Sequence, residues 1–93
     1  MGRWGSTKVG NLFASFRRNK KLTQQALARD LGISGHYEWL IESGRALPSP
    51  EILERLCSQM YFNINVAKIY LFNDKIEIYR QKVKKELGVE GVL

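Results

Sequence analysis

The sequence predicts an all-α domain built from five helices, the last of which is extended. Over most of the chain, apolar residues recur three and four positions apart, which is the spacing of one face of a helix. Thr23, Ser34 and Ser49 stand where side chains that cap helix N-termini are needed, and Gly32 and Pro48 stand where helices would end. The 93 residues suffice for one small domain with a modest core.

The first helix is predicted to begin at Val9, after a flexible basic arm at residues 1–8. Its apolar stripe follows i, i+3, i+4 and i+7 spacing and consists of Val9, Leu12, Phe13 and Phe16. Arg17 and Arg18 follow this stripe directly. We therefore expect the helix to bury one face in the core and to carry basic residues near its end.

The second and third helices are predicted to form a helix-turn-helix. Thr23 can cap the second helix, and Gly32 can adopt the positive φ that a sharp turn requires. Ser34 can cap a third helix, which Gly44 would end. Two short helices joined by a glycine-containing turn are typical of a unit that presents its second helix to the major groove of DNA.

The fourth helix is predicted to begin at Ser49, with Pro50 in its first turn. Its apolar stripe consists of Ile52, Leu53, Leu56 and Met60. Asn63 or Asn65 is the expected cap of the last helix, and residues 66–87 contain no Gly or Pro. This stretch is therefore long enough for an extended C-terminal helix.

The last helix carries an apolar stripe whose members are spaced three, four, three and four positions apart, as in a helix that packs along another helix. The stripe consists of Ile69, Phe72, Ile76, Tyr79 and Val83. We expect it to be buried, in part between two copies of the chain; the alternative is that it folds back over its own domain. Asn73 and Asp74 could split the stretch into two helices. Residues 9–72 are assigned to the helix-turn-helix domain, and residues 73–93 to a helical extension suited to dimerisation.

In the order of these elements the chain resembles the phage repressor and Cro-like helix-turn-helix domains, the lambda repressor-like or XRE type. The resemblance covers about residues 9–68. The elements that carry it are Thr23-Gln24, Ala28, the turn Leu31-Gly32-Ile33-Ser34, and Glu42-x-Gly44. It implies a five-helix, lambda repressor-like domain whose third helix reads DNA. It also implies a structural ion pair between Arg17 of the first helix and Glu42 of the third.

The resemblance further implies a set of contacts with double-stranded DNA. Phosphate contacts, which give affinity without sequence preference, are expected from Gln24, Lys20, Lys21 and Arg45. The residues expected to face the major groove are Ser34, Gly35, His36 and Trp39. Among these, His36 is the expected base reader.

The third helix departs from the family at several positions. Outward positions that usually hydrogen-bond base edges include Gly35 and Trp39 here, and Glu38 occupies a slot that the family fills with an aliphatic core residue. Two interpretations stay open. Either the helix is rotated so that Tyr37 and Trp39 point inward, or its surface is unusually apolar, as a protein-binding surface is.

The charge distribution favours a polyanionic partner. The net charge is +6 and the isoelectric point about 9.7. Residues 1–29 contain basic residues but no acidic ones, namely Arg3, Lys8, Arg17, Arg18, Lys20, Lys21 and Arg29. This basic surface suits a row of phosphates. A solvated basic face is the alternative interpretation.

No catalytic site, metal site or cofactor is predicted, so we do not expect an enzyme. His36 is the only histidine and has no Cys, Asp or Glu at metal-ligand spacing. Cys57 is the only cysteine, which excludes an internal disulfide, and it falls among apolar residues of the fourth helix. No apolar run approaches the roughly 18 residues of a membrane span. We expect a cytoplasmic protein that does not associate with membranes.

The leading hypothesis is a sequence-specific DNA-binding transcriptional regulator, a repressor that acts as a homodimer on an operator. The alternative is a protein-interaction module that retains the helix-turn-helix fold but binds a protein partner through Trp39, Leu40 and the C-terminal helix. Duplex DNA separates the two hypotheses, because a DNA binder that uses several lysines loses affinity steeply as salt rises.

Overall fold

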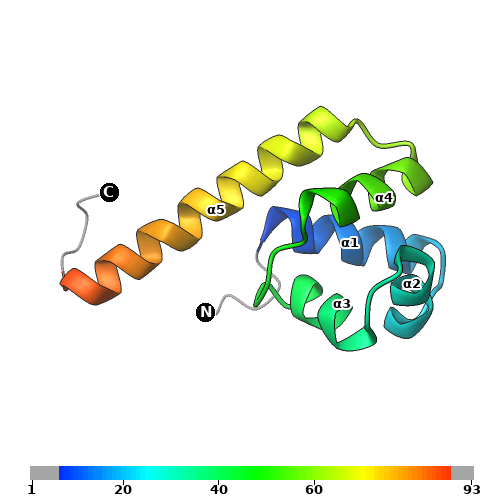
Figure 1. Cartoon of the computed structure of the whole chain (residues 1–93), viewed down its shortest axis with the longest axis horizontal. Helices are drawn as coiled ribbons and strands as arrows, with labels where there is room; N and C mark the ends of the chain where they lie inside the picture. Colours follow the sequence, from blue (N-terminus) through cyan, green and yellow to red (C-terminus); the bar gives the residue numbers. More distant parts are fainter. Residues whose placement is uncertain (1–6, 89–93) are drawn as a thin grey trace.

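The computed structural model describes residues 7–88, and five helices occupy that range (Figure 1). They are α1 (Lys8–Asn19), α2 (Gln24–Leu31), α3 (Gly35–Glu42), α4 (Pro50–Met60) and α5 (Ile64–Leu87). The predicted all-α, five-helix fold with an extended last helix is confirmed. Most of the predicted arm at residues 1–8 lies outside the described residues, as do residues 89–93 of the predicted extension.

Helix starts follow the caps that the sequence indicates. The side chains of Thr23, Ser34 and Ser49 accept backbone N–H groups of the helices that they precede, and Asn63 caps α5 in the same way. Each cap satisfies an N–H that has no partner within its helix. The cap of α1 is Thr7, whose hydroxyl accepts the N–H of Gly10 at 3.0 Å.

The core lies where all five helices meet. Its fully buried members are Val9, Phe13, Leu27, Leu31, Ile41, Leu53, Leu56 and Ala67. Gly10 permits α1 to approach the end of α3, because a Cβ there would lie 2.5 Å from the carbonyl oxygen of Ile41. Any larger residue would push α1 away from α3.

Helix α5 is continuous and is fixed to the rest of the domain by Asp74. The carboxylate of Asp74 accepts the backbone N–H groups of Lys8 and Val9, each at 2.9 Å, and the residue is only 6% exposed. A carboxylate at this position caps the first turn of α1, where the helix dipole favours negative charge. Asn73 and Asp74 therefore do not split the helix. Asp74 instead joins α5 to α1.

The apolar stripe of residues 69, 72, 76, 79 and 83, called the α5 stripe from here on, is not buried in the single chain. Ile69, Phe72 and Tyr79 are 57%, 62% and 63% exposed, and the other two members are half-buried. The expectation of burial is wrong for the single chain, because α5 packs on the domain through a different face, which contains Ala67, Leu71 and Asp74. The alternative, in which the stripe folds back over its own domain, is wrong for the same reason. The C-terminal part of α5 extends past the other helices (Figure 1).

Replacing Asp74 by alanine is expected to destabilise the domain by about 1–3 kcal/mol, because two buried N–H groups of α1 lose their acceptor. Asp74→Asn should cost less, since an amide oxygen still accepts one N–H. The matched control is Asn73→Ala, at an exposed neighbouring position of α5. Urea unfolding followed by circular dichroism gives the free energies. Equal stability of the Asp74→Ala and Asn73→Ala variants would contradict the capping role.

Candidate nucleic-acid interface

The predicted groove-facing residues lie at the cap of α3 and along its first five residues. Ser34, His36 and Trp39 are exposed, and Gly35 is half-buried. The Ser34 hydroxyl accepts the backbone N–H of Tyr37 at 3.0 Å, so its oxygen already serves as the helix cap. His36 and Trp39 therefore provide the ring surfaces that this helix offers to a ligand.

Trp39 joins His36 and Arg45 in one stack. The His36 and Trp39 ring centroids are 5.9 Å apart with an interplanar angle of 20°, and the Arg45 guanidinium carbon lies 4.9 Å from the Trp39 ring centroid. A guanidinium at this distance from an indole makes a cation–π contact. Arg45, predicted from the resemblance as a phosphate contact, is thus held against the ring on which the predicted base reader stacks.

The turn between α1 and α2 exposes two of the predicted phosphate contacts, Lys20 and Lys21. Lys21 has a φ of 58°, in the left-handed region, and the N–H of Leu22 returns to the carbonyl oxygen of Arg17 at 3.0 Å. This closed turn reverses the chain while both lysine side chains remain in solvent. The Lys20 ammonium lies 6.0 Å from the Phe16 ring centroid.

Gln24, another predicted phosphate contact, is half-buried and donates its amide N–H to Glu42 at 3.1 Å. One N–H of that amide is left for a phosphate, because the group carries two donors. The neighbouring Gln25 was not among the predicted site residues. Its exposed side chain lies against Gly35, at a place that a Cβ on residue 35 would occupy. The helix-weakening glycine in the first turn of α3 was the signal that pointed to such a close contact.

Arg17 and Glu42, the predicted structural pair, lie in direct contact. Arg17 Nε and one terminal nitrogen donate to the two oxygens of Glu42 at 2.8 and 3.1 Å. A second terminal nitrogen of Arg17 donates to the carbonyl oxygen of Leu22 at 3.0 Å. With the Gln24 bond, this network ties α1, the following turn and α2 to the last residue of α3. It thereby sets the position of the predicted recognition helix.

Glu38 lies in the core, one turn before Glu42. It is 0% exposed, and within the described residues neither carboxyl oxygen has a hydrogen-bond partner. The alternative of a rotated α3 is therefore half right. Tyr37 packs against the core and donates its hydroxyl to the carbonyl oxygen of Leu47 at 3.1 Å, whereas Trp39 stays 38% exposed.

The two glutamates have opposite pKa shifts. Burial, together with the neighbouring Glu42, raises the pKa of Glu38 to about 9. Burial alone would also raise the pKa of Glu42, but its interactions with Glu38, Arg17 and Gln24 outweigh burial and lower it below its usual value. At neutral pH, Glu38 is thus a neutral acid and Glu42 the carboxylate that binds Arg17.

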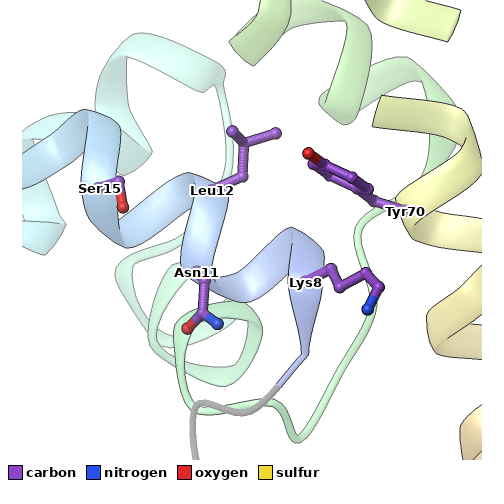
Figure 2. Close-up of a pocket in the computed structure, with 5 residues that line it drawn as sticks. All are labelled: Lys8, Asn11, Leu12, Ser15 and Tyr70. Carbon is purple, nitrogen blue, oxygen red and sulfur yellow. The ribbon is translucent and has the colours of Figure 1, made fainter. Parts of the chain in front are cut away.

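A shallow pocket of about 390 Å³ lies on another part of the molecule, between α1 and α5. Figure 2 shows its lining, with Leu12 and the Tyr70 ring projecting toward one another from the two helices and Lys8 nearby. No residue of α2 or α3 lines it. A molecule in this pocket would therefore not touch the predicted recognition helix.

Two negative findings concern the described residues 7–88. They contain no group of three or more His, Cys, Asp or Glu residues arranged to hold a metal ion. None of the helices in this range is long and apolar enough to cross a membrane.

Comparison with known proteins identifies the family. Residues 8–59 match the family described as helix-turn-helix domain, which is more than half of the chain. The chain belongs to this family of DNA-binding domains. It is also 39% identical over 62 residues to the "ImmF control region 10 kDa protein" of Bacillus phage phi105, an alignment that covers 67% of this chain and 69% of the relative. This relative supports the phage repressor-like type of helix-turn-helix. No solved structure matches the chain.

In this helix-turn-helix domain, breaking the Arg17–Glu42 pair should cost about 3–5 kcal/mol, because the remaining charge is largely buried and loses its partner. We expect this loss for Arg17→Met and, to a smaller extent, for Glu42→Gln, whose amide oxygen still accepts one N–H. Arg18→Met, at the exposed neighbouring position, is the control and should be nearly neutral. Thermal unfolding measures the effect. Unchanged melting temperatures in both pair variants would refute it.

Glu38 should make stability depend on pH. The folded state keeps the proton up to pH about 9, whereas the unfolded chain releases it near its ordinary pKa of 4.5. The folded state therefore binds more protons between these values, and the free energy of unfolding should fall as pH rises from about 5 to 9. Glu42 acts oppositely, because its lowered pKa contributes stability that is lost as pH falls below 4.5.

Two substitutions separate titration from burial at Glu38. Glu38→Gln should flatten the pH dependence between 5 and 9, because the amide does not titrate. Glu38→Met should flatten it equally and add about 1–3 kcal/mol of stability, since no unsatisfied polar group remains buried. The measurement is urea unfolding across the pH range. A wild-type profile that is as flat as that of Glu38→Gln would show that the carboxyl does not retain its proton.

Proposed function

We propose that this protein is a sequence-specific transcriptional repressor that binds an operator in double-stranded DNA as a homodimer in the cytoplasm. The observation that carries the proposal is the presentation of α3. Its outer face exposes His36 and Trp39, and its last residue is held by the Arg17–Glu42–Gln24 network. A fixed helix whose outer face presents side chains near its N-terminus is what major-groove recognition requires. The phage control-region relative supports a regulatory role.

Base reading is assigned to the exposed rings of α3. His36 can donate or accept a hydrogen bond at a base edge, and the apolar Trp39 suits a thymine methyl group. Arg45, stacked on Trp39, extends the surface with a guanidinium. Lys20 and Lys21 on the α1–α2 turn, with Gln24 at the start of α2, would bind phosphates and set the register on the duplex.

Dimeric action follows from the small size of the reading surface. One recognition helix reads only a few base pairs, and two copies related by a two-fold axis double the length of the site. The exposed α5 stripe is the surface proposed for contact between the copies. It lies on a helix that packs against α1 and α4, so a second copy there leaves α3 accessible.

A second candidate function is a protein-interaction module that binds through Trp39 and Leu40. The 38% exposure of Trp39 favours it, because a large aromatic on the surface is typical of protein interfaces. The binding chemistry of the two candidates differs. DNA binding should weaken steeply with salt, whereas an apolar protein contact should not.

Selection of bound sequences from a random duplex library tests the proposal. We expect a palindromic site with half-sites about one helical turn, roughly 34 Å, apart. Enrichment of a single half-site would contradict dimeric binding but would still support sequence-specific recognition of DNA. Failure to enrich any sequence at low salt would overturn DNA recognition and favour the protein-interaction module.

Variants of the selected complex separate base reading from phosphate contact. His36→Ala should reduce affinity for the selected site by about 1–3 kcal/mol and leave random duplex binding almost unchanged. Lys20→Ala and Lys21→Ala should each weaken binding to the selected site and to random duplex alike. Each should also lower the slope of log affinity against log salt concentration by about 1. Lys85→Ala, at an exposed position of α5 outside the stripe and its flanks, is the control and should do neither. Equal losses of the His36 variant on both duplexes would exclude it as a reader.

A further inference from the structure

The α5 stripe combines exposed apolar residues with flanks that carry positive charge. The three positions preceding its first, third and fifth members are all lysines, namely Lys68, Lys75 and Lys82. On the other flank lie Asn73, Arg80 and Leu87. No acidic residue flanks the stripe on either side. In paired helices, the residues at these flanking positions meet those of the partner and determine which partner is accepted.

Half of this charge is not neutralised within the described residues. The ammonium of Lys68 lies 3.7 Å from a carboxyl oxygen of Glu54, and Arg80 lies 4.0 Å from Glu77. Lys75 and Lys82 are exposed and form no ion pair with any residue of the described range 7–88. The flank formed by Lys68, Lys75 and Lys82 is therefore a row of lysines, two of them unpaired, that an incoming helix must meet.

A second copy of α5 matches this row poorly in either orientation. In a parallel pair, Lys75 would face Arg80 of the other copy, while Lys68 and Lys82 would face Asn73 and Leu87. In an antiparallel pair, lysines of one copy would face lysines of the other. Like charges brought together in this way destabilise an interface, so self-association through the stripe is opposed by charge.

We propose that the α5 stripe is a docking surface for an amphipathic helix of another protein with acidic residues beside its apolar seam. Such a helix would bury Ile69, Phe72 and Tyr79 and would place carboxylates against Lys75 and Lys82. An acidic amphipathic helix would match both features of the surface, the apolar residues spaced three and four apart and the basic flanks. A second copy of α5 would match only the apolar residues, because its own flanks are basic too.

The shape of the apolar surface favours a helix over an anionic membrane. The stripe is a narrow seam of two residues per heptad, and Glu86, three positions after Val83, ends it with an acidic residue in the same line. A helix that lies in a membrane surface has a broad apolar face and a basic opposite face instead. Asp74 also holds the first half of α5 against α1, which limits how the helix could sink into a bilayer.

Docking of this kind would have a regulatory consequence, which rests on the proposed function. If two copies contact each other through the α5 stripe on an operator, an acidic helix competes for the same surface. The competitor gains attraction where the second copy meets repulsion. It would therefore release the dimer from DNA without touching α3.

The direct test uses the full-length protein without DNA and two labelled helical peptides of about three heptads each. Both carry leucine or isoleucine in the seam. One has glutamate at the flanking positions and the other has lysine. Fluorescence anisotropy should show the acidic peptide binding at least about tenfold more tightly than the basic one. The difference should shrink as salt screens the charges.

Two variants locate the binding. Lys75→Glu/Lys82→Glu should invert the preference, so that the basic peptide binds more tightly. Phe72→Ser/Tyr79→Ser should abolish binding of both peptides. All four positions are exposed, so circular dichroism should show an unchanged fold.

Several results would overturn the proposal. Equal affinities for the two peptides, or no binding of either, would remove the acidic partner. Anionic vesicles that bind through Phe72 and Tyr79 while the peptides do not would assign the surface to lipid. A dimer that excess acidic peptide fails to displace in sedimentation would assign it to a second copy. The peptide test contains no DNA, so a failed duplex selection would not affect the proposal of an acidic helical partner. Likewise, a failed peptide test would not affect the proposal of DNA recognition.

Discussion

The position of α3 depends on the Glu42 carboxylate. It receives two hydrogen bonds from Arg17 on α1 and one from Gln24 on α2, so three helices meet at one anion. Burial opposes the charge, yet these donors keep the pKa of Glu42 below its usual value. The protonated Glu38 one turn away is compatible with this arrangement, because a second buried charge there would compete for Arg17. The core thus holds one ionised carboxylate and one neutral acid on the same helix.

Much of the fold could be predicted because it depends on local chemistry. The caps at Thr23, Ser34, Ser49 and Asn63, and the positive φ of Gly32, follow from short-range sequence, and they set where helices begin and end. The Arg17–Glu42 contact is not local, and it was predicted only because the chain resembles a family. Asp74 shows the limit of local reasoning. From the sequence it could split the last helix. Its actual partners are the backbone N–H groups of Lys8 and Val9, which lie more than 60 positions earlier in the chain.

The candidate site was harder to predict than the fold. The family resemblance placed His36 and Trp39 on the groove-facing side of α3, but the stacking of Arg45 on Trp39 depends on how the chain leaves that helix. The α5 stripe was recognised by its period, and its expected burial was wrong because α5 has two apolar faces. The face through Ala67 and Leu71 packs on the domain and leaves the more regular one exposed. Periodicity identifies a face suited to packing but does not say which face the domain uses.

The structure joins the two proposed surfaces through α1. Its N-terminus is capped by Asp74 of α5, and Arg17 near its C-terminus is paired with Glu42 of α3. Both joints are buried and involve charged groups, whose rupture is costly. Helices α1, α3 and α5 should therefore move as one body, and a partner on the α5 stripe has no hinge through which to reorient α3. Regulation through that stripe would act by occupancy: the bound helix excludes the second copy, and each remaining monomer keeps an intact reading surface but holds only half of the operator.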